Sequence, residues 1–229
     1  MNPLKELSII IPIGATESEW PILLSDLELL PQESEIIIVV PDGCPFPQAK
    51  AGLRFVQSPP GRAKQMNTGA RQARNKFLWF VHADSRIPSQ SIEALKNALI
   101  EAPSRLHFFD LEFLADGPVL TRLNTLGAWV RARLLGLPFG DQGFCISKNL
   151  FESLGRFPEN VLYGEDHLFV WKARKSGIPI RSTRGRIYTS SRKYRDKGWA
   201  KTTLQHGYLT AKQALPEWIS YLAGKGTMK

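Results

Sequence analysis

The first half of the chain alternates apolar runs with segments of helical spacing. Residues 7–13 and 35–40 are continuous apolar runs rich in β-branched side chains, which is typical of strands buried on both faces. Between them, residues 18–30 place apolar side chains at a helical period. The same order repeats with a short run at 53–57, a helix over 61–75 and an apolar strand that ends at Asp84. This alternation predicts a doubly wound, mostly parallel sheet with right-handed crossovers.

The pattern changes after Pro88. A helix over 89–100 leads to residues 105–114, where apolar and polar positions alternate, and this predicts a half-exposed antiparallel strand. Then follow an amphipathic helix over 119–135, a loop entering a short strand at 140–146, a helix over 165–176 that stops at Gly177, and a helical region over 192–222. We therefore expect an α/β fold with a mixed C-terminal part and a helical tail. It divides into a domain over residues 1–190 and a basic helical extension over 191–229.

Charge is distributed unevenly along the 229 residues. Residues 1–170 hold 16 Lys/Arg and 19 Asp/Glu, a balance of −3, whereas residues 171–229 hold 14 and 2, a balance of +12. Such a tail suits an anionic partner such as a phosphorylated substrate, an acidic lipid surface or a nucleic acid, and a solvated basic face explains it equally well. The sequence shows neither a leader peptide nor a membrane-spanning run, so we expect a cytoplasmic protein.

Acidic residues mark the ends of predicted strands. Asp84 follows a buried strand, and the carboxyl ends of parallel strands face the ligand crevice of an open α/β sheet. Asp42 follows an earlier strand and could accept hydrogen bonds from a base or ribose, although a plain turn residue before a glycine reads the same way. A second cluster, Glu165-Asp166, could take a proton while Asp84 holds a metal-diphosphate. This pairing is what transfer from a nucleotide-activated donor requires.

The segment 61–69 carries polar groups at a predicted helix start. Arg62 and Lys64 can neutralise phosphates there, and Gln65 and Asn67 offer amide contacts. The chain has neither a Gly-rich dinucleotide fingerprint nor a phosphate loop of the Gly-x4-Gly-Lys-Ser/Thr type, which argues against a dehydrogenase or an ATPase.

These motifs together resemble family 2 glycosyltransferases over residues ~7–190. The similarity rests on the strand at 9–13, Asp42-Gly43, the run 62–69, His82-Ala-Asp84, Gly140-Asp-Gln142 and Gly164-Glu-Asp166. More narrowly, Arg-Ala-x-Gln-Met-Asn, His-Ala-Asp and Gly-Asp-Gln look like the small transferases associated with radical-SAM and selenium-domain proteins.

The resemblance implies a GT-A fold, a UDP- or GDP-linked sugar donor, a divalent cation (Mn²⁺ or Mg²⁺) and inversion at the anomeric carbon. It implies that Ile11, Pro12 and Asp42 flank the nucleoside. It also implies that Arg62, Gln65 and Asn67 border the donor site. Asp84 takes the last position of the family's Asp-x-Asp metal motif, and His82 stands where the first Asp would be. This departure leaves one carboxylate fewer for the metal.

On the same resemblance, Asp166 is the base that deprotonates the acceptor hydroxyl. Asp141, Gln142 and Glu165 then belong to the acceptor side. The alternative is that Glu165 and Asp166 only stabilise a helix N-terminus through its dipole.

Three functions stay open at this point: an active transferase, an inactive sugar-nucleotide-binding module, and a nucleic-acid-binding protein that uses the basic tail. The acidic N-terminal portion argues against the last, so no nucleic-acid partner is expected. An anionic or lipid-linked acceptor, peripheral membrane contact and homo-oligomerisation are the other partners that the basic tail suggests.

Overall fold

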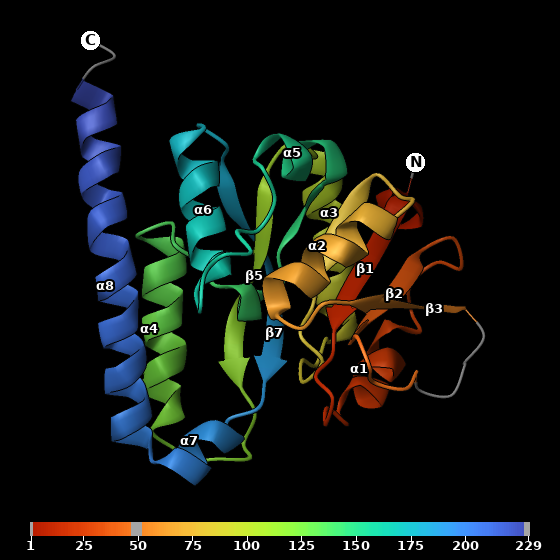
Figure 1. Ribbon diagram of the computed structural model, residues 1–229, viewed down its shortest axis with the longest axis horizontal. Helices are drawn as coiled ribbons and strands as arrows, with labels where there is room; N and C mark the ends of the chain where they lie inside the picture. The colour runs from red at the N-terminus through yellow and green to blue at the C-terminus, as the bar shows by residue number, and fades with distance from the viewer. Residues whose placement is uncertain (1, 47–51, 227–229) are drawn as a thin grey trace.

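Within residues 2–46 and 52–226, which the computed structural model describes, seven strands form a sheet in the order β3-β2-β1-β4-β6-β5-β7 (Figure 1). The four on one side are parallel: β1 (Leu7–Pro12), β2 (Glu35–Pro41), β3 (Leu53–Ser58) and β4 (Phe77–Phe80). The short β6 (Cys145–Ser147) is antiparallel to both β4 and β5 (Leu106–Phe113). β7 (Ile180–Thr189) lies parallel to β5. The predicted mostly parallel sheet with a mixed second half is therefore confirmed.

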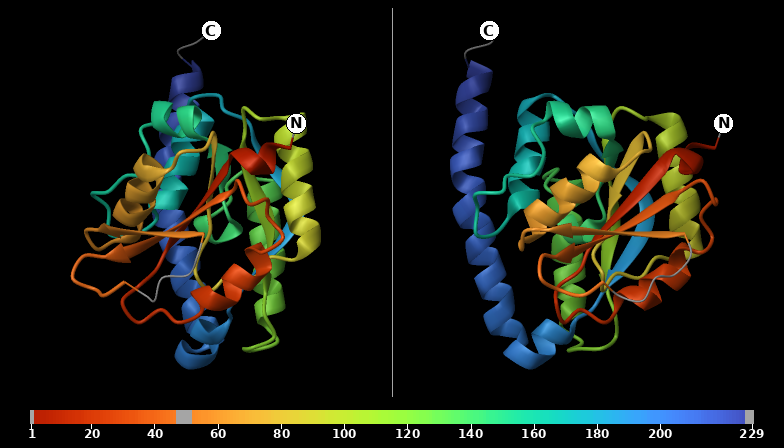
Figure 2. Two further views of the ribbon diagram at one scale, coloured as in Figure 1. Left: turned by 90° about the vertical axis from the view of Figure 1, so that its right-hand side faces the viewer. Right: turned by 45° about the vertical axis from the view of Figure 1, so that its right-hand side comes forward.

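Helices cover both faces of the sheet (Figure 2). The helices are α1 (Trp20–Leu27), α2 (Arg62–Gln72), α3 (Ser89–Glu101), α4 (Thr121–Arg133), α5 (Lys148–Ser153), α6 (Glu165–Lys175), α7 (Arg192–Lys197) and α8 (Trp199–Gly226), with short 3₁₀ turns at Pro3–Glu6 and Gly140–Gln142. Buried side chains of α1 and α3 share one core with the sheet, and those of α2, α5 and α6 share the other. The sheet, with the carboxyl ends of its parallel strands, thus lies between two packed layers of helices.

Residues of β1 alternate between these two cores. Ile9 and Ile11 pack on the side of α1 and α3, whereas Ile10 packs on the side of α2. Helix α2 approaches β1 closely because Gly69 has no side chain, and a Cβ atom there would lie 2.5 Å from Cγ2 of Ile10. This close approach fixes the C-terminal half of α2 against β1, and the hydrogen bond from Gln65 Nε2 to Ile13 O (2.8 Å) holds its N-terminal half beside the carboxyl end of the strand.

The sequence prediction was wrong or incomplete in three segments. Residues 106–109 of β5 are buried rather than half-exposed, because both faces of the strand are packed: Leu106 and Phe108 lie in one core and Phe109 lies in the other. The strand β7 and the short helix α5 were not predicted. The predicted C-terminal helix is divided at Gly198 into α7 and α8.

Helix α8 runs beside α4 and extends past the end of the domain (Figures 1 and 2). It is attached by Trp218 and Tyr221, which pack against Trp171 of α6 with ring centroids 5.2 and 6.1 Å away. Near its start, Asn124 of α4 donates a hydrogen bond to Thr203 Oγ1 (3.0 Å). No helix of the described residues combines the length and apolar character needed to cross a bilayer.

Candidate active site

A cleft of about 430 Å³ opens at the carboxyl ends of β4, β5 and β7. Three carboxylates line it from separate parts of the chain: Asp84 after β4, Asp141 in the turn before β6, and Asp166 in the first turn of α6. Arg62, at the start of α2, lines the same cleft and an adjoining hollow of about 560 Å³. The strand-end location is where open α/β sheets bind ligands.

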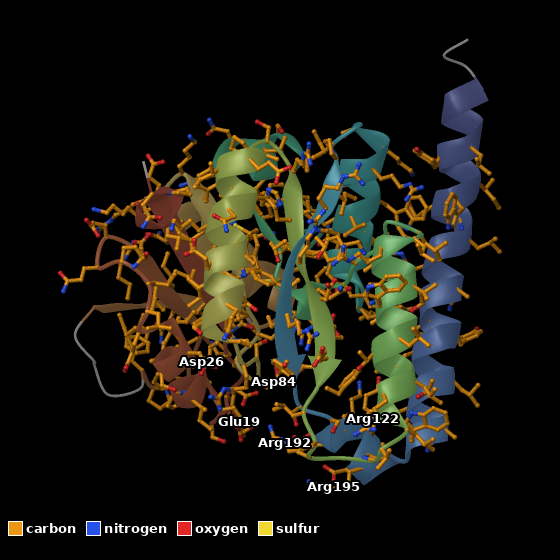
Figure 3. All side chains as sticks on the ribbon, turned by 180° about the vertical axis from the view of Figure 1, so that it is seen from behind. Glu19, Asp26, Asp84, Arg122, Arg192 and Arg195 are labelled. Carbon is orange, nitrogen blue, oxygen red and sulfur yellow. The ribbon has the colours of Figure 1, made fainter. Side chains whose placement is uncertain are left out.

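Asp84 lies at the end of the sheet near the junction of α1 and α7 (Figure 3). Burial and the nearby Glu17 carboxylate raise the pKa of Asp84 above its ordinary value, while the charge of Arg62 opposes the rise. Its described side-chain hydrogen bond is a long one, accepted from Thr189 Oγ1 at 3.4 Å. Next to it, the Glu19–Arg192 ion pair (3.0 Å) joins the start of α1 to α7. Asp84 therefore has acceptor capacity left for a ligand.

The surroundings of Asp141 disfavour the charged form of its carboxylate. Burial raises its pKa to about 6; Arg131 and Arg62 act to lower it, and the Asp166 and Asp84 charges add to the rise. Its Oδ1 atom is buried and finds no hydrogen-bond partner within the described chain. A charge held without hydrogen bonds costs folding free energy, which favours a functional role over a structural one.

Arg131 of α4 provides the opposing positive charge. Its guanidinium carbon lies 3.2 Å from the centroid of the Phe139 ring, and burial lowers its pKa to about 10 against the charges of Asp141 and Asp166. Sequence reasoning missed this residue, because an arginine in an amphipathic helix looks like any solvated one.

Asp166 is held by two backbone groups. Its Oδ2 atom accepts the N–H of Gly140, and its Oδ1 atom accepts the N–H of His167 at 2.8 Å. The helix is entered through Gly164, whose φ of +70° favours glycine, and a Cβ atom there would lie 2.0 Å from Oε1 of Gln213 in α8. Two backbone N–H groups and the glycine at the start of the helix thus position the Asp166 carboxylate.

Three residues proposed from the sequence to contact ligands face the protein instead. Gln65 is 6% exposed and donates to the carbonyls of Ile13 (2.8 Å) and Val39 (2.9 Å). Asn67 is 2% exposed; it donates to Phe157 O and Glu159 Oε1 and accepts from Phe157 N–H.

The third of these residues is Gln142. It is fully buried, donates to Phe109 O (2.9 Å) and accepts from Phe139 N–H (3.0 Å) and Arg131 Nη2 (3.3 Å). These amides brace the walls of the site, and their side-chain groups bond to the protein. The predicted places of Gln65 and Asn67 beside the donor and of Gln142 beside the acceptor stay predictions.

The remaining predicted residues lie around the cleft with different access. The side chain of Ile11 is fully buried in the core, so its predicted place beside a nucleoside rests on its backbone alone. Pro12 is partly buried at the end of β1, and Asp42 is exposed in the turn after β2. Glu165 lines the adjoining hollow, and burial, with the charge of Asp166, raises its pKa.

Two groups that the sequence did not predict, both on α7, line the cleft together with two histidines. Lys193 and Tyr194 of α7 line it, as does His206 of α8, whose Nε2 accepts a hydrogen bond from Lys193 Nζ at 2.9 Å. His82 also lines the cleft, and burial together with the Arg62 charge lowers its pKa well below the usual range, so the imidazole is neutral at pH 7. The basic run 192–197 was the available signal for Lys193, but its place beside the cleft depends on the unpredicted β7.

The side chains of the site could hold a metal ion only together with oxygen atoms of a bound nucleotide diphosphate. In the part of the chain that the structure describes, no group of three or more His, Cys, Asp or Glu side chains is arranged around a common point for a metal ion. Asp84 and Asp141 are the cleft carboxylates with acceptor capacity left, since Asp84 accepts one long hydrogen bond and Asp141 Oδ1 accepts none from the described residues. Diphosphate oxygens could complete the oxygen shell that Mg²⁺ or Mn²⁺ prefers.

Comparison with known proteins identifies the fold. S. aureus TarS 1–349 in complex with UDP-GlcNAc superposes with a TM-score of 0.60 and 20% identity, covering 81% of this chain and 58% of that one. The same protein in complex with UDP gives 0.62 and 21%, covering 81% and 60%. The chain has the GT-A glycosyltransferase fold.

At these identities the GT-A assignment concerns architecture alone, and the chain spans less than two thirds of the length of those TarS structures. No protein-family model and no curated protein sequence matches the chain. The acidic cleft occupies the place at the carboxyl ends of the strands where this class of sheet binds its ligands.

Proposed function

We propose that this chain is a glycosyltransferase that moves a sugar from a UDP- or GDP-linked donor to an acceptor hydroxyl with inversion. The observation that carries the proposal is the convergence of Asp84, Asp166 and Arg62 on one cleft of a GT-A fold. The sequence motifs further favour family 2 and its subgroup associated with radical-SAM and selenium-domain proteins.

In the proposed donor site, Arg62 faces the diphosphate as its positive partner, and charge-assisted hydrogen bonds from a guanidinium suit phosphate oxygens. Asp84 would hold the divalent cation, Mn²⁺ or Mg²⁺, whose chemistry is to neutralise charge on the leaving diphosphate. Pro12 and Asp42, at the ends of β1 and β2, would border the nucleoside. TarS, with the same fold, has been solved with UDP and with UDP-GlcNAc bound, which supports this class of donor.

In the proposed reaction, Asp166 accepts the proton of the acceptor hydroxyl. The oxygen attacks the anomeric carbon from the face opposite the diphosphate, the bond between that carbon and the diphosphate oxygen breaks, and the nucleoside diphosphate leaves with its electron pair. Asp141 and Glu165 flank the acceptor side. An anionic or lipid-linked acceptor is compatible with Lys193 at the cleft.

The test is a sugar-nucleotide panel (UDP-glucose, UDP-GlcNAc, UDP-galactose and GDP-mannose) in which thermal shift and hydrolysis are measured with and without Mn²⁺ or Mg²⁺. Arg62→Ala should weaken binding roughly 10- to 100-fold, since a hydrogen bond to a charged group contributes about 1.5–3 kcal/mol. Arg181→Ala is the matched control, because Arg181 is exposed at the opposite end of the sheet. Binding without turnover would identify an inactive module, and absence of binding would contradict the proposal.

A further inference from the structure

The outer faces of α4 and α8 carry large apolar side chains that nothing in the described chain covers. We define the α4–α8 surface by six of them, each more than half exposed: Leu123 and Leu126 of α4, Leu134 directly after it, and Leu204, Leu215 and Ile219 of α8. The two helices lie side by side in Figures 1 and 3 and are joined by the Asn124–Thr203 hydrogen bond. Large apolar side chains exposed together on two neighbouring helices mark an interaction site more often than isolated ones do.

Helix α8 has two apolar sides, one packed against the domain and one exposed. One side faces the domain, where Trp218 and Tyr221 pack against Trp171. The other carries Leu204, Tyr208, Leu215, Ile219 and Leu222, each more than 60% exposed and spaced so that they form a stripe along the outward side. The stripe is therefore available to a partner while the inner face remains attached.

The charge around this surface selects the partner. Of the six Lys/Arg in residues 121–133 and 199–226, Arg131 stacks on Phe139 at the cleft and Arg133 pairs with Asp110 (2.6 Å), so neither charge is free for a partner. The one acid of these two segments, Glu217, pairs with Lys175 (2.7 Å). Arg122, Lys201 and Lys212 are exposed on the same two helices. Two copies of this chain joined through the surface would bring these like charges together, which disfavours association. An anionic lipid surface complements them.

We propose that the α4–α8 surface docks on an anionic lipid bilayer. The apolar side chains enter the boundary between headgroups and acyl chains, and the basic side chains meet lipid phosphates, as in helices that lie in the plane of the interface.

Docking through this surface also determines where the cleft lies relative to the bilayer. The inner face of α8 lines it with His206, Leu209, Thr210 and Gln213. If the proposed glycosyl transfer is correct, on which this point rests, docking through the outward side of α8 leaves the cleft on the other side of that helix, about one helix diameter (~10 Å) from the headgroups that would carry an acceptor.

The experiment is vesicle flotation of the full chain. Vesicles of phosphatidylcholine alone are compared with vesicles of equal parts phosphatidylcholine and phosphatidylserine, at low and moderate salt. Wild type should float with the anionic vesicles. Leu204→Gln/Leu215→Gln/Ile219→Gln should reduce the partition coefficient roughly tenfold or more, because glutamine retains helix propensity but removes the buried apolar area.

Two further variants complete the design. Leu29→Gln/Ile100→Gln, at residues 65% and 57% exposed after α1 and within α3, is the matched control and should float like wild type. Lys201→Gln/Lys212→Gln should lower binding about fivefold per residue at low salt and less at moderate salt. This second variant leaves the apolar stripe intact, so it tests the proposal even if the triple variant does not fold.

The outcomes separate docking from transfer. A wild-type chain that never floats overturns the proposal. So does a dimer in sedimentation velocity that the triple variant dissociates, since the surface is then an interface between copies. UDP binding by calorimetry on the same samples reports on the proposed function alone: a chain that floats without binding sugar nucleotides supports docking and contradicts glycosyl transfer.

Discussion

Replacing Asp141 by asparagine should make the protein more stable at neutral pH. Burial raises the pKa of this carboxyl from an ordinary 3.8 to about 6, so the folded state resists its ionisation. The stability associated with the protonated form is fully present below about pH 4 and is lost as the pH rises through about 6. Asparagine stays neutral at every pH and avoids that loss.

The magnitude follows from the same values. A rise from 3.8 to about 6 corresponds to about 3 kcal/mol at about 1.4 kcal/mol for each tenfold change in the ionisation constant. The Asp141 residue is only partly buried at the cleft wall, so solvent screens part of its charge and we expect Asp141→Asn to gain about 1–3 kcal/mol at pH 7.5. The gain should disappear near pH 4, where the wild-type carboxyl is also neutral.

Urea unfolding at pH 7.5 and pH 4 measures this difference directly. The matched control is Asp116→Asn, which should act in the opposite direction. Burial opposes it, but hydrogen bonds from the Ser190 hydroxyl and from the Ser191 hydroxyl and N–H hold the pKa of Asp116 below its ordinary value. The control variant should therefore be destabilised at pH 7.5. If Asp141→Asn is destabilised there, or changes stability equally at both pH values, the electrostatic reasoning is refuted.

Two further predictions concern the metal and the entry to α6. Asp84→Ala should weaken UDP binding in the presence of Mn²⁺ while leaving metal-free binding nearly unchanged, as calorimetry can show; equal affinity in a folded variant removes Asp84 from the site. Gly164→Ala should lower the free energy of unfolding by about 1–3 kcal/mol, from the left-handed backbone and the displaced Gln213 side chain. Gly207→Ala, in α8 with open space around it, should raise stability by about 0.8–1 kcal/mol, and a loss there as large as at Gly164 would contradict the account.

The parallel character of one side of the sheet could be predicted because β1 and β2 are apolar on both faces. The strand β7 could not, although its burial alternates regularly from residue 183 onward. Its inward positions are Thr183, Gly185, Ile187 and Thr189, so hydrophobicity does not follow burial. Gly185 stands where a Cβ atom would lie 3.0 Å from the Ser91 backbone, which shows that close packing against α3 replaced apolar bulk.

The residues of the candidate site also include some that the sequence could predict and some that it could not. Asp84 could be predicted because it follows a buried strand, and Asp166 because it lies at the start of a helix. The structure brings both to one cleft. Gln65, Asn67 and Gln142 could not be separated from ligand contacts in the sequence, because an amide that satisfies backbone carbonyls looks identical to one that binds a nucleotide. Their partners are distant in the chain and appear only after folding.

The most direct test of glycosyl transfer is to compare donor affinity and turnover in Asp166→Asn, once the panel has identified a donor. The substitution removes the basic carboxylate, and its amide can accept only one of the two backbone N–H groups that Asp166 accepts now. We predict donor affinity close to wild type and turnover reduced about 10²–10⁴-fold. Turnover near that of wild type would contradict the assignment of Asp166 as the base, and a loss of affinity as large as the loss of turnover would place it in donor binding instead.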